Sequence, residues 1–518
     1  MYGKMNNGHS ATKRFHLSAF ARVLATCLVS ASLFFTSAAM AGLPAFPGAQ
    51  GGGALAVGGR GGAVCKVTNL NDTGPGSLRA CVDMKGPRMV IFEVGGAIEL
   101  ESRLQITNPY ITIAGQTASG DGIQLKAASG LRGDMLMVRT HDVVIRHLRL
   151  RRGVTGHKLG VLNIIDQWHG VGDIVKNVIV DHVSLYWTEN ENLAIWGLDE
   201  LTAPRNITVQ NSIMAEALNR PNVAVGGQFK EAGLQMNDVD LHGNLFANST
   251  HRNPTFRPAS GRFINNIVYN ASYWWTRMGS GTYADVIGNK YKRGPSRLSS
   301  TRAQEELHFW QYSEEMGSPE RHLERDSSLY IVGNRGEASG MSPEIDNWRY
   351  TRLVGEAGGN AAPVGPTPEE YKRSPWEPLP HAGVPITVRN ADDLEGYVLP
   401  HVGASKRLDC GGNWVPNRDS VDSRLIEEYF KEQGITSPSH PDEVGGFPVL
   451  SGGVPCVDSS GDGIPDEWLL ANSLDTADAS LGATIHTSGY SYLELYLNGM
   501  RVESAVPAPQ APGAISVN

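Results

Sequence analysis

Two arginines lie five residues apart in the stretch HRNPTFR, with a proline between them. Arg252 and Arg257 flank Pro254, and the stretch follows DVDLHGNLFANS, a run that mixes apolar residues with asparagines. A guanidinium binds a carboxylate in bidentate fashion and stabilises negative charge that develops in a reaction. The formal net charge of the chain is −8, so a generally basic surface does not explain the pair. The pair indicates a site for an anionic substrate, or arginines that tie a loop to its scaffold.

A second group of chemically suited residues lies near the C-terminus, in the run DSSGDGIPDEWLLANSLD that begins at residue 458. Polar residues occupy odd positions of this run and Gly463 is sixth, which is the spacing of a calcium-binding loop. The ligands that this spacing predicts are Asp458, Ser460, Asp462, the backbone carbonyl of Ile464, and Asp466. Leu469 stands where an EF-hand has a bidentate glutamate, so we expect a variant calcium loop, with an ordinary Asp-rich turn as the alternative.

Short strands must position these residues, because β-branched and apolar residues alternate over stretches that start 22 to 34 residues apart. The stretches begin at residues 110, 143, 177, 206, 238, 262 and 284. Each is too short to bury its own apolar face, so successive copies must stack. Stacked amides form hydrogen-bonded ladders, and asparagines recur at similar places in four repeats, as Asn211, Asn244, Asn266 and Asn289. The pattern predicts an all-β fold, a right-handed parallel β-helix, with a β-sandwich as the competing fold.

Irregular regions between and after the repeats predict long loops. The inserts at residues 153 to 176 and 212 to 237 are expected to project from one side and to form the walls of a groove. From about 295 to 440, charged runs and a stretch rich in proline and glycine predict long loops or a helix packed along the solenoid.

The composition agrees with a globular protein rich in β-strands. Hydrophobic residues make up 41% of the 518 residues, which supplies a substantial core and excludes disorder throughout. Charged residues make up 19%, too few for a coiled coil, while 60 glycines and 29 prolines indicate many turns.

The first 41 residues are typical of a secretion signal. Lys13, Arg14 and Arg22 precede the apolar run VLATCLVSASLFF, and AMA at residues 39 to 41 offers a cleavage site. The run is short for a bilayer span, which weakens the alternative of a membrane anchor. We expect a secreted protein, extracellular or, in a bacterium, periplasmic.

Cysteine usage agrees with export. Cys27 leaves with the signal, and the other four cysteines allow three disulfide connectivities. Loop closure favours near partners, which predicts the disulfides Cys65–Cys81 and Cys410–Cys456. Metal ligation is the weaker alternative, because no C-x-x-C spacing accompanies these cysteines.

Several separated motifs together resemble one enzyme family. The pattern R-x-P-x-x-R after a β-helix strand resembles the active-site signature of pectate lyases of polysaccharide lyase family one. The resemblance extends to AFPGAQGGGALAVGGRGGAVCKVTNLNDTGPGSLRAC near the start, ITIAGQTASGDGI at 111, DHVSLYW at 181, and HVGAS and RDSVDSRLI between 401 and 426. DGIPDEW and YSYLELYLNG are similar to the C-terminal extension of some of these lyases.

The resemblance implies a lyase that cleaves (1→4)-α-D-galacturonan with Ca²⁺ as cofactor and gives unsaturated oligogalacturonides. Removal of the proton next to a uronate carboxylate builds negative charge, which calcium and arginines stabilise. The resemblance implies Arg252 as the general base and Arg257 as a residue that grips the substrate or braces the site. Lys230 is a candidate second cationic contact. A guanidinium is a poor base, but a neighbouring calcium ion lowers its pKa, so alkaline activity is expected.

Acidic residues around the DH strand are the calcium ligands that the resemblance implies. They are Asp166, Glu191 and Asp199. The chain departs from the family pattern at Asn190, where relatives commonly have an aspartate, and at Ile195, four residues after Glu191. Each carboxylate is alternatively a solvated loop residue. Asp181 and His182 are expected to buttress their strand.

Aromatic residues in or beside the inserts leave other functions open. They stack on sugar rings or pack in the core, and they are Trp168, Trp187, Trp196, Trp274 and Trp275. An aromatic cleft is reminiscent of pectin lyases, which act on methyl-esterified polymer without calcium. Another uronate lyase and a noncatalytic β-solenoid that binds polysaccharide are further alternatives.

We expect a monomer that binds anionic plant cell-wall polysaccharide, and neither nucleic acid nor membrane. The predicted segments are a signal peptide at 1–41, a β-helix lyase domain at 42–440, a calcium-loop extension at 441–500 and a flexible tail at 501–518.

Overall fold

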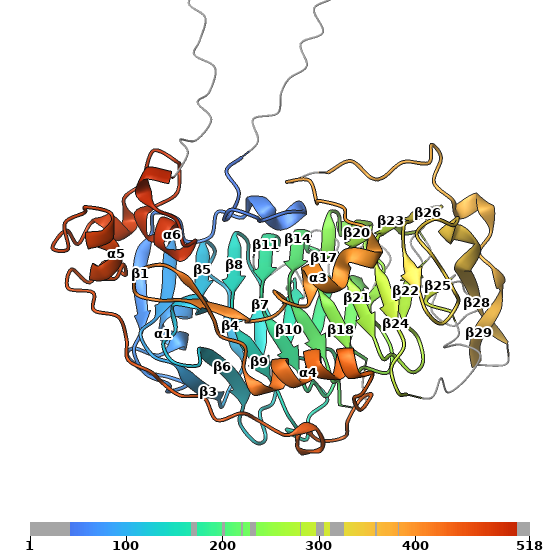
Figure 1. Cartoon of the computed structure of the whole chain (residues 1–518), viewed down its shortest axis with the longest axis horizontal. Coiled ribbons are helices and arrows are strands. Elements are labelled where there is room, and N and C mark those ends of the chain that lie inside the picture. Colours follow the sequence, from blue (N-terminus) through green and yellow to red (C-terminus); the bar gives the residue numbers. More distant parts are fainter. Residues whose placement is uncertain are drawn as a thin grey trace, which may run out of the picture. The chain divides into compact units, whose positions relative to one another are not determined.

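The scaffold is a stack of coils in which each turn of the chain adds strands to three sheets (Figure 1). The computed structural model describes residues 42–166, 173–198, 202–218, 221–227, 235–279, 281–296, 305–310, 326–357, 360–381 and 383–504. Within these ranges, neighbouring strands of the three sheets pair in parallel, apart from the antiparallel pair at the end of one sheet. The fold is a right-handed parallel β-helix, which confirms the prediction.

The strands of each sheet follow one another in chain order. Sheet 1 consists of β1 (Ala63–Val67), β2 (Arg88–Phe92), β5 (Ile111–Ala114), β8 (Val143–Arg146), β11 (Lys176–Asp181), β14 (Arg205–Gln210), β17 (Val239–His242), β20 (Ser260–Ile264), β23 (Tyr283–Ile287) and β26 (Ser328–Val332). Sheet 2 consists of β4 (Leu104–Ile106), β7 (Leu136–Val138), β10 (Leu162–Ile165), β13 (Leu193–Gly197), β16 (Val223–Gly227), β19 (Thr255–Phe256), β22 (Thr276–Gly279), β25 (Leu307–Trp310), β28 (Thr351–Ala357) and the antiparallel β29 (Asn360–Pro366). Sheet 3 consists of β3 (Gly96–Leu100), β6 (Ile123–Ala127), β9 (Arg149–Arg151), β12 (Ser184–Tyr186), β15 (Ile213–Ala215), β18 (Leu245–Ala247), β21 (Ile267–Tyr269), β24 (Lys290–Lys292) and β27 (Arg335–Gly336).

Most of the predicted stretches cross one corner of a coil, from a strand of sheet 1 to a strand of sheet 3. β11 ends at Asp181 and β12 begins at Ser184, and His182 between them has a φ of 53°. In the adjoining coils, His147 and Asn211 hold the same place, with φ of 53° and 50°. Histidine and asparagine are enriched in this left-handed conformation. Polar residues in the sequence therefore mark the corners of the solenoid.

The asparagine ladder exists, but its register differs by one residue from the prediction at its first member. Backbone N and side-chain Nδ2 of each member donate to Oδ1 of the next along Asn244, Asn266, Asn289, Asn334 and Asn347. Asn211 is not a member, because its Nδ2 donates to Asp181 Oδ1 at 3.1 Å. Ser212 takes the ladder position, and its backbone N donates to Asn244 Oδ1 at 2.9 Å. The prediction for Asn211 was wrong, since the residue turns the corner.

Both inserts that were expected to be loops contribute strands. The insert at 153 to 176 contains β10, and the insert at 212 to 237 contains β16. These strands have four and five residues. Their apolar runs are too short to distinguish them from loops by periodicity.

The region from 295 to 440 divides into a continuation of the solenoid and a return segment. β25, β26, β27 and β28 extend the three sheets beyond the repeats that the sequence revealed. α4 (Ser420–Lys431) lies along sheet 3, where its buried Val421, Leu425 and Tyr429 pack in one apolar cluster with Ile213 of β15. The predicted helix along the solenoid is confirmed.

Further helices pack against the first coils and against a later one. α1 (Leu78–Asp83) places Leu78 in the main core, and α3 (Leu394–Val398) joins the cluster of α4. α5 (Asp466–Ala471) and α6 (Tyr492–Leu497) share an apolar cluster with Met89 and Ile91 of β2. Within the described ranges, no helix combines the length and the apolar character that a membrane span requires.

Both predicted disulfides are confirmed. Cys65 is bonded to Cys81, and Cys410 is bonded to Cys456. Cys410 lies between the antiparallel strands β30 (Lys406–Leu408) and β31 (Trp414–Pro416). The second disulfide therefore joins the predicted lyase domain to the predicted extension across the expected boundary at 440.

Candidate active site

Arg252 lies in the turn that leads into β19 of sheet 2. Its backbone has a φ of 60°, and the turn is held by the buried side chain of Asn253. Asn253 Nδ2 donates to Ser249 O at 3.1 Å, and Asn253 Oδ1 accepts from Asn222 Nδ2 at 2.8 Å. Asn222 in turn accepts from Asn192 at 2.9 Å. A second amide ladder therefore fixes the turns before the strands of sheet 2, and with them the place of Arg252.

The nearest partner of Arg252 is Glu191, in the turn before β13. Arg252 Nη1 donates to Glu191 Oε1 at 2.5 Å. Glu191 is 7% exposed, whereas the side chain of Arg252 keeps 31% of its surface exposed. Burial raises the pKa of Glu191, the Arg252 guanidinium opposes this shift, and the negative charge of Asp134 adds to it. The pair thus combines a reachable guanidinium with a carboxylate whose charge is costly without a nearby cation.

Two further oxygen-bearing side chains lie beside Glu191. Asp134 Oδ1 accepts from Gly160 N at 2.7 Å. A Cβ on Gly160 would lie 2.8 Å from Asn163 Oδ1, 3.1 Å from Glu191 O and 3.3 Å from Asp134 Oδ1, so glycine lets these groups come together. In the described part of the chain, the buried Asn163 Oδ1 has no hydrogen-bond partner. An unpaired buried acceptor beside the Asp134 carboxylate and the backbone carbonyl of Glu191 is suited to a hard cation.

Arginines and aromatic rings continue the same face of sheet 2. Arg257 is 5% exposed, donates through Nη2 to Gly227 O at 3.3 Å, and lies with Cζ 5.5 Å from the centre of the Trp196 ring. Arg277, in register with Thr255 of β19, donates through Nη2 to Thr255 Oγ1 at 2.8 Å. A Cβ on Gly226 would approach the Arg257 guanidinium to 3.0 Å, so glycine there makes room for it.

The pKa of His251 reflects burial and the positive charge of the neighbouring arginines. Burial lowers its pKa to about 3, and the charges of Arg252 and Arg277 lower it further in the same direction. The imidazole is therefore neutral at the pH values at which most proteins work.

The structure separates Asp166 from Glu191. Leu162 of β10 is in register with Leu193 of β13, so Asp166 lies six residues further along the strand direction than Glu191, roughly 20 Å at about 3.3 Å per residue. Asp166 is fully buried; Oδ1 accepts from Leu198 N at 2.7 Å and Oδ2 from Thr202 Oγ1 at 3.3 Å. Asp166 therefore does not share an ion with Glu191, and the grouping of these two ligands was wrong.

Other predicted site residues fall outside the described residues or inside the core. Asp199, Lys230 and Trp168 lie outside the described residues, as do the signal peptide and most of the tail. Trp187, Trp274 and Trp275 are buried, whereas Trp196 is half-buried beside Arg257. Core packing therefore explains three of the predicted stacking residues.

Asp181 and His182 buttress their strand, as expected. Asp181 Oδ2 accepts from Arg146 Nε at 3.0 Å, and Asp181 Oδ1 accepts from Gln210 Nε2 at 2.9 Å. These contacts tie three neighbouring coils of sheet 1 together.

The predicted calcium loop in the C-terminal extension brings some of its ligands together. Asp458 accepts from Gly461 N and Gly463 N, both at 2.8 Å, and Asp462 Oδ1 accepts from Ile464 N at 2.9 Å. Within the described residues, the other oxygen of Asp462 is buried without a partner.

Two contacts distinguish this loop from a set of converging calcium ligands. Lys66 Nζ lies 2.7 Å from Asp458 Oδ2 and 2.8 Å from Glu93, so an ammonium already compensates the charge. Ser460 Oγ donates to Asp458 Oδ1 at 3.3 Å, while Asp466 accepts from Ser459. Three of the five predicted ligands, Asp458, Ser460 and Asp462, are thus linked by hydrogen bonds with each other or with the turn between them.

Comparison with known proteins identifies the family. No protein-family model matches the chain. Probable pectate lyase C of Aspergillus fumigatus is 32% identical over 489 residues, which cover 92% of this chain and 98% of the relative. Probable pectate lyase C of Aspergillus terreus is 33% identical over 467 residues, which cover 88% and 94%. The chain belongs to the pectate lyase family. A solved pectate lyase of Bacillus sp. N165 in complex with trigalacturonate is 15% identical, with a TM-score of 0.41 over 68% of this chain and 98% of that chain.

As a member of the pectate lyase family, the chain is a polysaccharide lyase. Sequence reasoning missed Asp134, which acts on Glu191, Asn163, which lies beside Gly160, and Arg277, which lies near His251. Asn163 is in register with Ala194 of β13, and Thr255 with Arg277 of β22. The sequence did hold a signal, because a polar residue that interrupts an apolar strand points away from the core. It was hidden because β10 itself was taken for a loop.

Proposed function

We propose that this chain is a calcium-dependent pectate lyase that cleaves (1→4)-α-D-galacturonan by β-elimination and gives unsaturated oligogalacturonides. The observation that carries the proposal is the contact between Arg252 Nη1 and Glu191 Oε1, which joins the most exposed guanidinium of the site to a buried carboxylate. In the reaction, a base takes the proton from C5 of a uronate, a C4–C5 double bond forms, and the C4–O bond to the next sugar breaks.

Asp134, Asn163 and Glu191 fit a calcium ion. They offer carboxylate and amide oxygens, the ligands that calcium prefers. The unpartnered Asn163 Oδ1 and the raised pKa of Glu191 support this assignment, since a cation would satisfy the first and offset the second. Bound there, calcium would supply positive charge that withdraws electrons from the uronate carboxylate. Glu191 is the ligand shared with the prediction from the sequence, and Asp134 replaces Asp166.

Arg252 is the proton acceptor in this proposal. The turn built on Asn253 and the contact with Glu191 hold its side chain in one orientation. Arg257 is almost fully buried and bonded to the backbone of the next strand, so we assign it a bracing role. Positive charge along sheet 2 lowers the free energy of the carbanion that forms when the proton leaves.

The test is the rate at which ultraviolet absorbance of the unsaturated product appears on polygalacturonate. Calcium should be required, and chelator should abolish the rate. Arg252→Lys should keep the fold and the charge but lose most of the turnover, seen in kcat. Arg205→Lys, at the start of β14 in sheet 1, is the control and should keep full activity. A lysine variant with the kcat of the control would refute Arg252 as the proton acceptor.

The same assay separates the pectin lyase alternative. Full activity in chelator on methyl-esterified pectin, without activity on polygalacturonate, would favour that reading. The burial of Trp187 and Trp275 removes two rings from the aromatic cleft on which it rested.

We further propose that the protein is secreted as a monomer that starts near Gly42. The two disulfides support an oxidising compartment. N-terminal sequencing and size-exclusion chromatography of protein from the culture medium test both points; a retained signal or a stable dimer would overturn them.

A further inference from the structure

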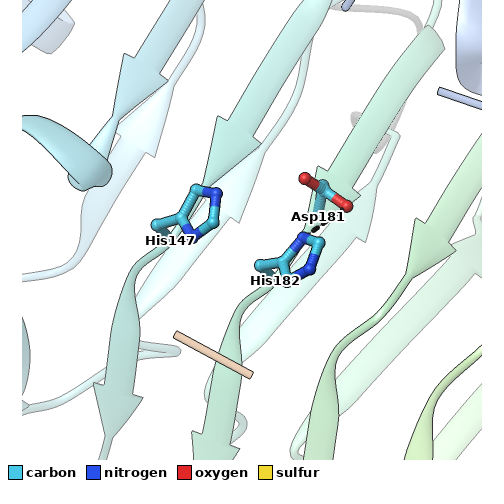
Figure 2. Close-up of side chains that lie close together, drawn as sticks. All are labelled: His147, Asp181 and His182. Atoms are coloured by element: carbon cyan, nitrogen blue, oxygen red, sulfur yellow. Dashed lines mark ion pairs between the residues drawn. The ribbon is translucent and has the colours of Figure 1, made fainter. Parts of the chain in front are cut away.

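Two histidines and an aspartate form a cluster at a corner of the solenoid, on sheet 1 (Figure 2). His147 follows β8, Asp181 ends β11, and His182 follows it. Arg146 is in register with Asp181, so the two histidines hold the same place in successive coils, each with a φ of 53°. The repeat itself therefore aligns the two imidazoles.

The rings are close and only partly satisfied. Their centres lie 4.9 Å apart with an angle of 13° between the ring planes, and one ligand atom from each of the three residues lies within 4.8 Å of the others. His147 is 5% exposed, and within the described residues neither of its ring nitrogens has a hydrogen-bond partner. A buried imidazole with two unpaired nitrogens is costly, unless water or an ion binds it.

Asp181 is arranged as a support for His182. Asp181 Oδ1 lies 2.8 Å from His182 Nδ1 (Figure 2), and the carboxylate is fixed by Arg146, Gln210 and Asn211. A carboxylate on one imidazole nitrogen fixes the tautomer and directs the lone pair of the other nitrogen outward, as in many metal sites. The side chain of His182 is 20% exposed, which leaves a route for an ion.

We propose that His147 and His182 bind one divalent transition-metal ion, Zn²⁺ being the probe of choice, with Asp181 as the carboxylate that orients His182. Imidazole nitrogens favour zinc, copper and nickel, whereas calcium prefers oxygen ligands. The nearly parallel rings must turn about χ2 to converge on one ion, and this torsion is soft for histidine. The site lies on sheet 1, and the proposed calcium ligands precede or belong to strands of sheet 2.

The bound ion would link successive coils close to the return segment of the chain. The ring of Trp414, on β31, lies 5.0 Å from that of His147. An ion at the histidines therefore lies near a tryptophan, and paramagnetic Ni²⁺ should quench its fluorescence.

The chain contains a matched control. His141 Nδ1 lies 2.8 Å from Asp142 Oδ2, the same adjacent histidine–aspartate contact, but its ring neighbour is Tyr110 in place of a second histidine. The test variants are His147→Asn and His182→Asn, since Asn211 holds the same place with the same backbone conformation in the next coil. His141→Asn is the control variant.

The experiment is equilibrium dialysis of the full mature chain against Zn²⁺ with excess Ca²⁺ present, followed by metal analysis. Wild type and His141→Asn should each retain one Zn²⁺ that His147→Asn and His182→Asn lose. Equal zinc content in all four proteins, or loss in the His141 variant alone, would overturn the proposal. Ni²⁺ titration gives a second readout: quenching should weaken in Trp414→Phe, and unchanged quenching would count against the site.

Discussion

Glu191→Gln tests how much of the turnover depends on the contact between Glu191 and Arg252. The substitution keeps the shape of the side chain and removes the charge. A hydrogen bond to a charged group contributes about 1.5–3 kcal/mol. The side chain of Arg252 is 31% exposed, so solvent screens the pair and we take the lower end, about 1.5–2 kcal/mol. If that energy holds Arg252 in its reactive position, kcat should fall by roughly 10- to 30-fold at saturating calcium.

The control for this prediction is Glu189→Gln, two residues away. Glu189 Oε2 accepts from Thr155 N at 2.7 Å and from Thr155 Oγ1 at 2.6 Å. In the described part of the chain, the hydrogen bond and ion pair of Arg252 go to Glu191 and not to Glu189. Both variants are assayed by product absorbance over a calcium titration, after circular dichroism has shown that they fold. Glu191→Gln should also need more calcium for half-maximal rate. Equal kcat and equal calcium dependence in the two variants would refute the role of Glu191.

Three further predictions concern stability. Asn266→Ala removes four side-chain hydrogen bonds of the ladder and should lower the free energy of unfolding by about 3–5 kcal/mol in urea. Asn211→Gly keeps the left-handed backbone, loses one hydrogen bond to the Asp181 carboxylate and should cost about 1.5–3 kcal/mol; a larger cost for Asn211→Gly than for Asn266→Ala would contradict the ladder register. Burial opposes the charge of Asp419, but the Arg151 guanidinium outweighs burial and lowers the pKa of Asp419 to about 2. The stabilisation from this carboxylate is present above the unfolded pKa of about 4 and should fade as pH falls toward 2. Asp419→Asn should therefore lower the free energy of unfolding by about 3–5 kcal/mol at pH 7 and by much less near pH 2, and a loss that does not change with pH would refute this prediction. Lys66→Met should tighten calcium binding to the C-terminal loop, since its ammonium contacts Asp458; unchanged calcium-dependent melting would count against that loop as a calcium site.

The solenoid could be predicted from the sequence because each coil repeats the same pattern of residues. Alternating strands, corner residues and amides recur at a fixed register, and a one-residue slip would turn apolar side chains outward. The same rule explains the error at Asn211: two polar residues stand side by side at that corner, and only one of them, Ser212, faces the ladder. Composition cannot distinguish the two, because asparagine suits both places.

The candidate site was only partly predictable for a different reason. Arg252, Arg257 and Glu191 stand out as a local motif or an acidic turn. Asp134 and Asn163 join them through coil stacking, at separations of 57 and 28 residues from Glu191. Such neighbours can be predicted only from the register of the strands. They cannot be recognised in the sequence while an intervening strand, here β10, is taken for a loop. Asp166 was misplaced for the same reason, since its distance from Glu191 depends on where β10 begins.

Helices cover the outward faces of sheet 3 and of the first coils of sheet 1. Sheet 1 has outward apolar residues such as Met89 and Ile91, which pack beneath α5 and α6, and sheet 3 packs beneath α4. The strand RMVIF of β2 is apolar at every position after its first, which is typical of a strand buried on both faces. The outward row of sheet 2 instead has Asn163, Thr255 and Arg277 in linked registers. A row that carries amide, hydroxyl and guanidinium groups gains little from an apolar cover, so this face suits the calcium ion and the polyanion of the proposed reaction.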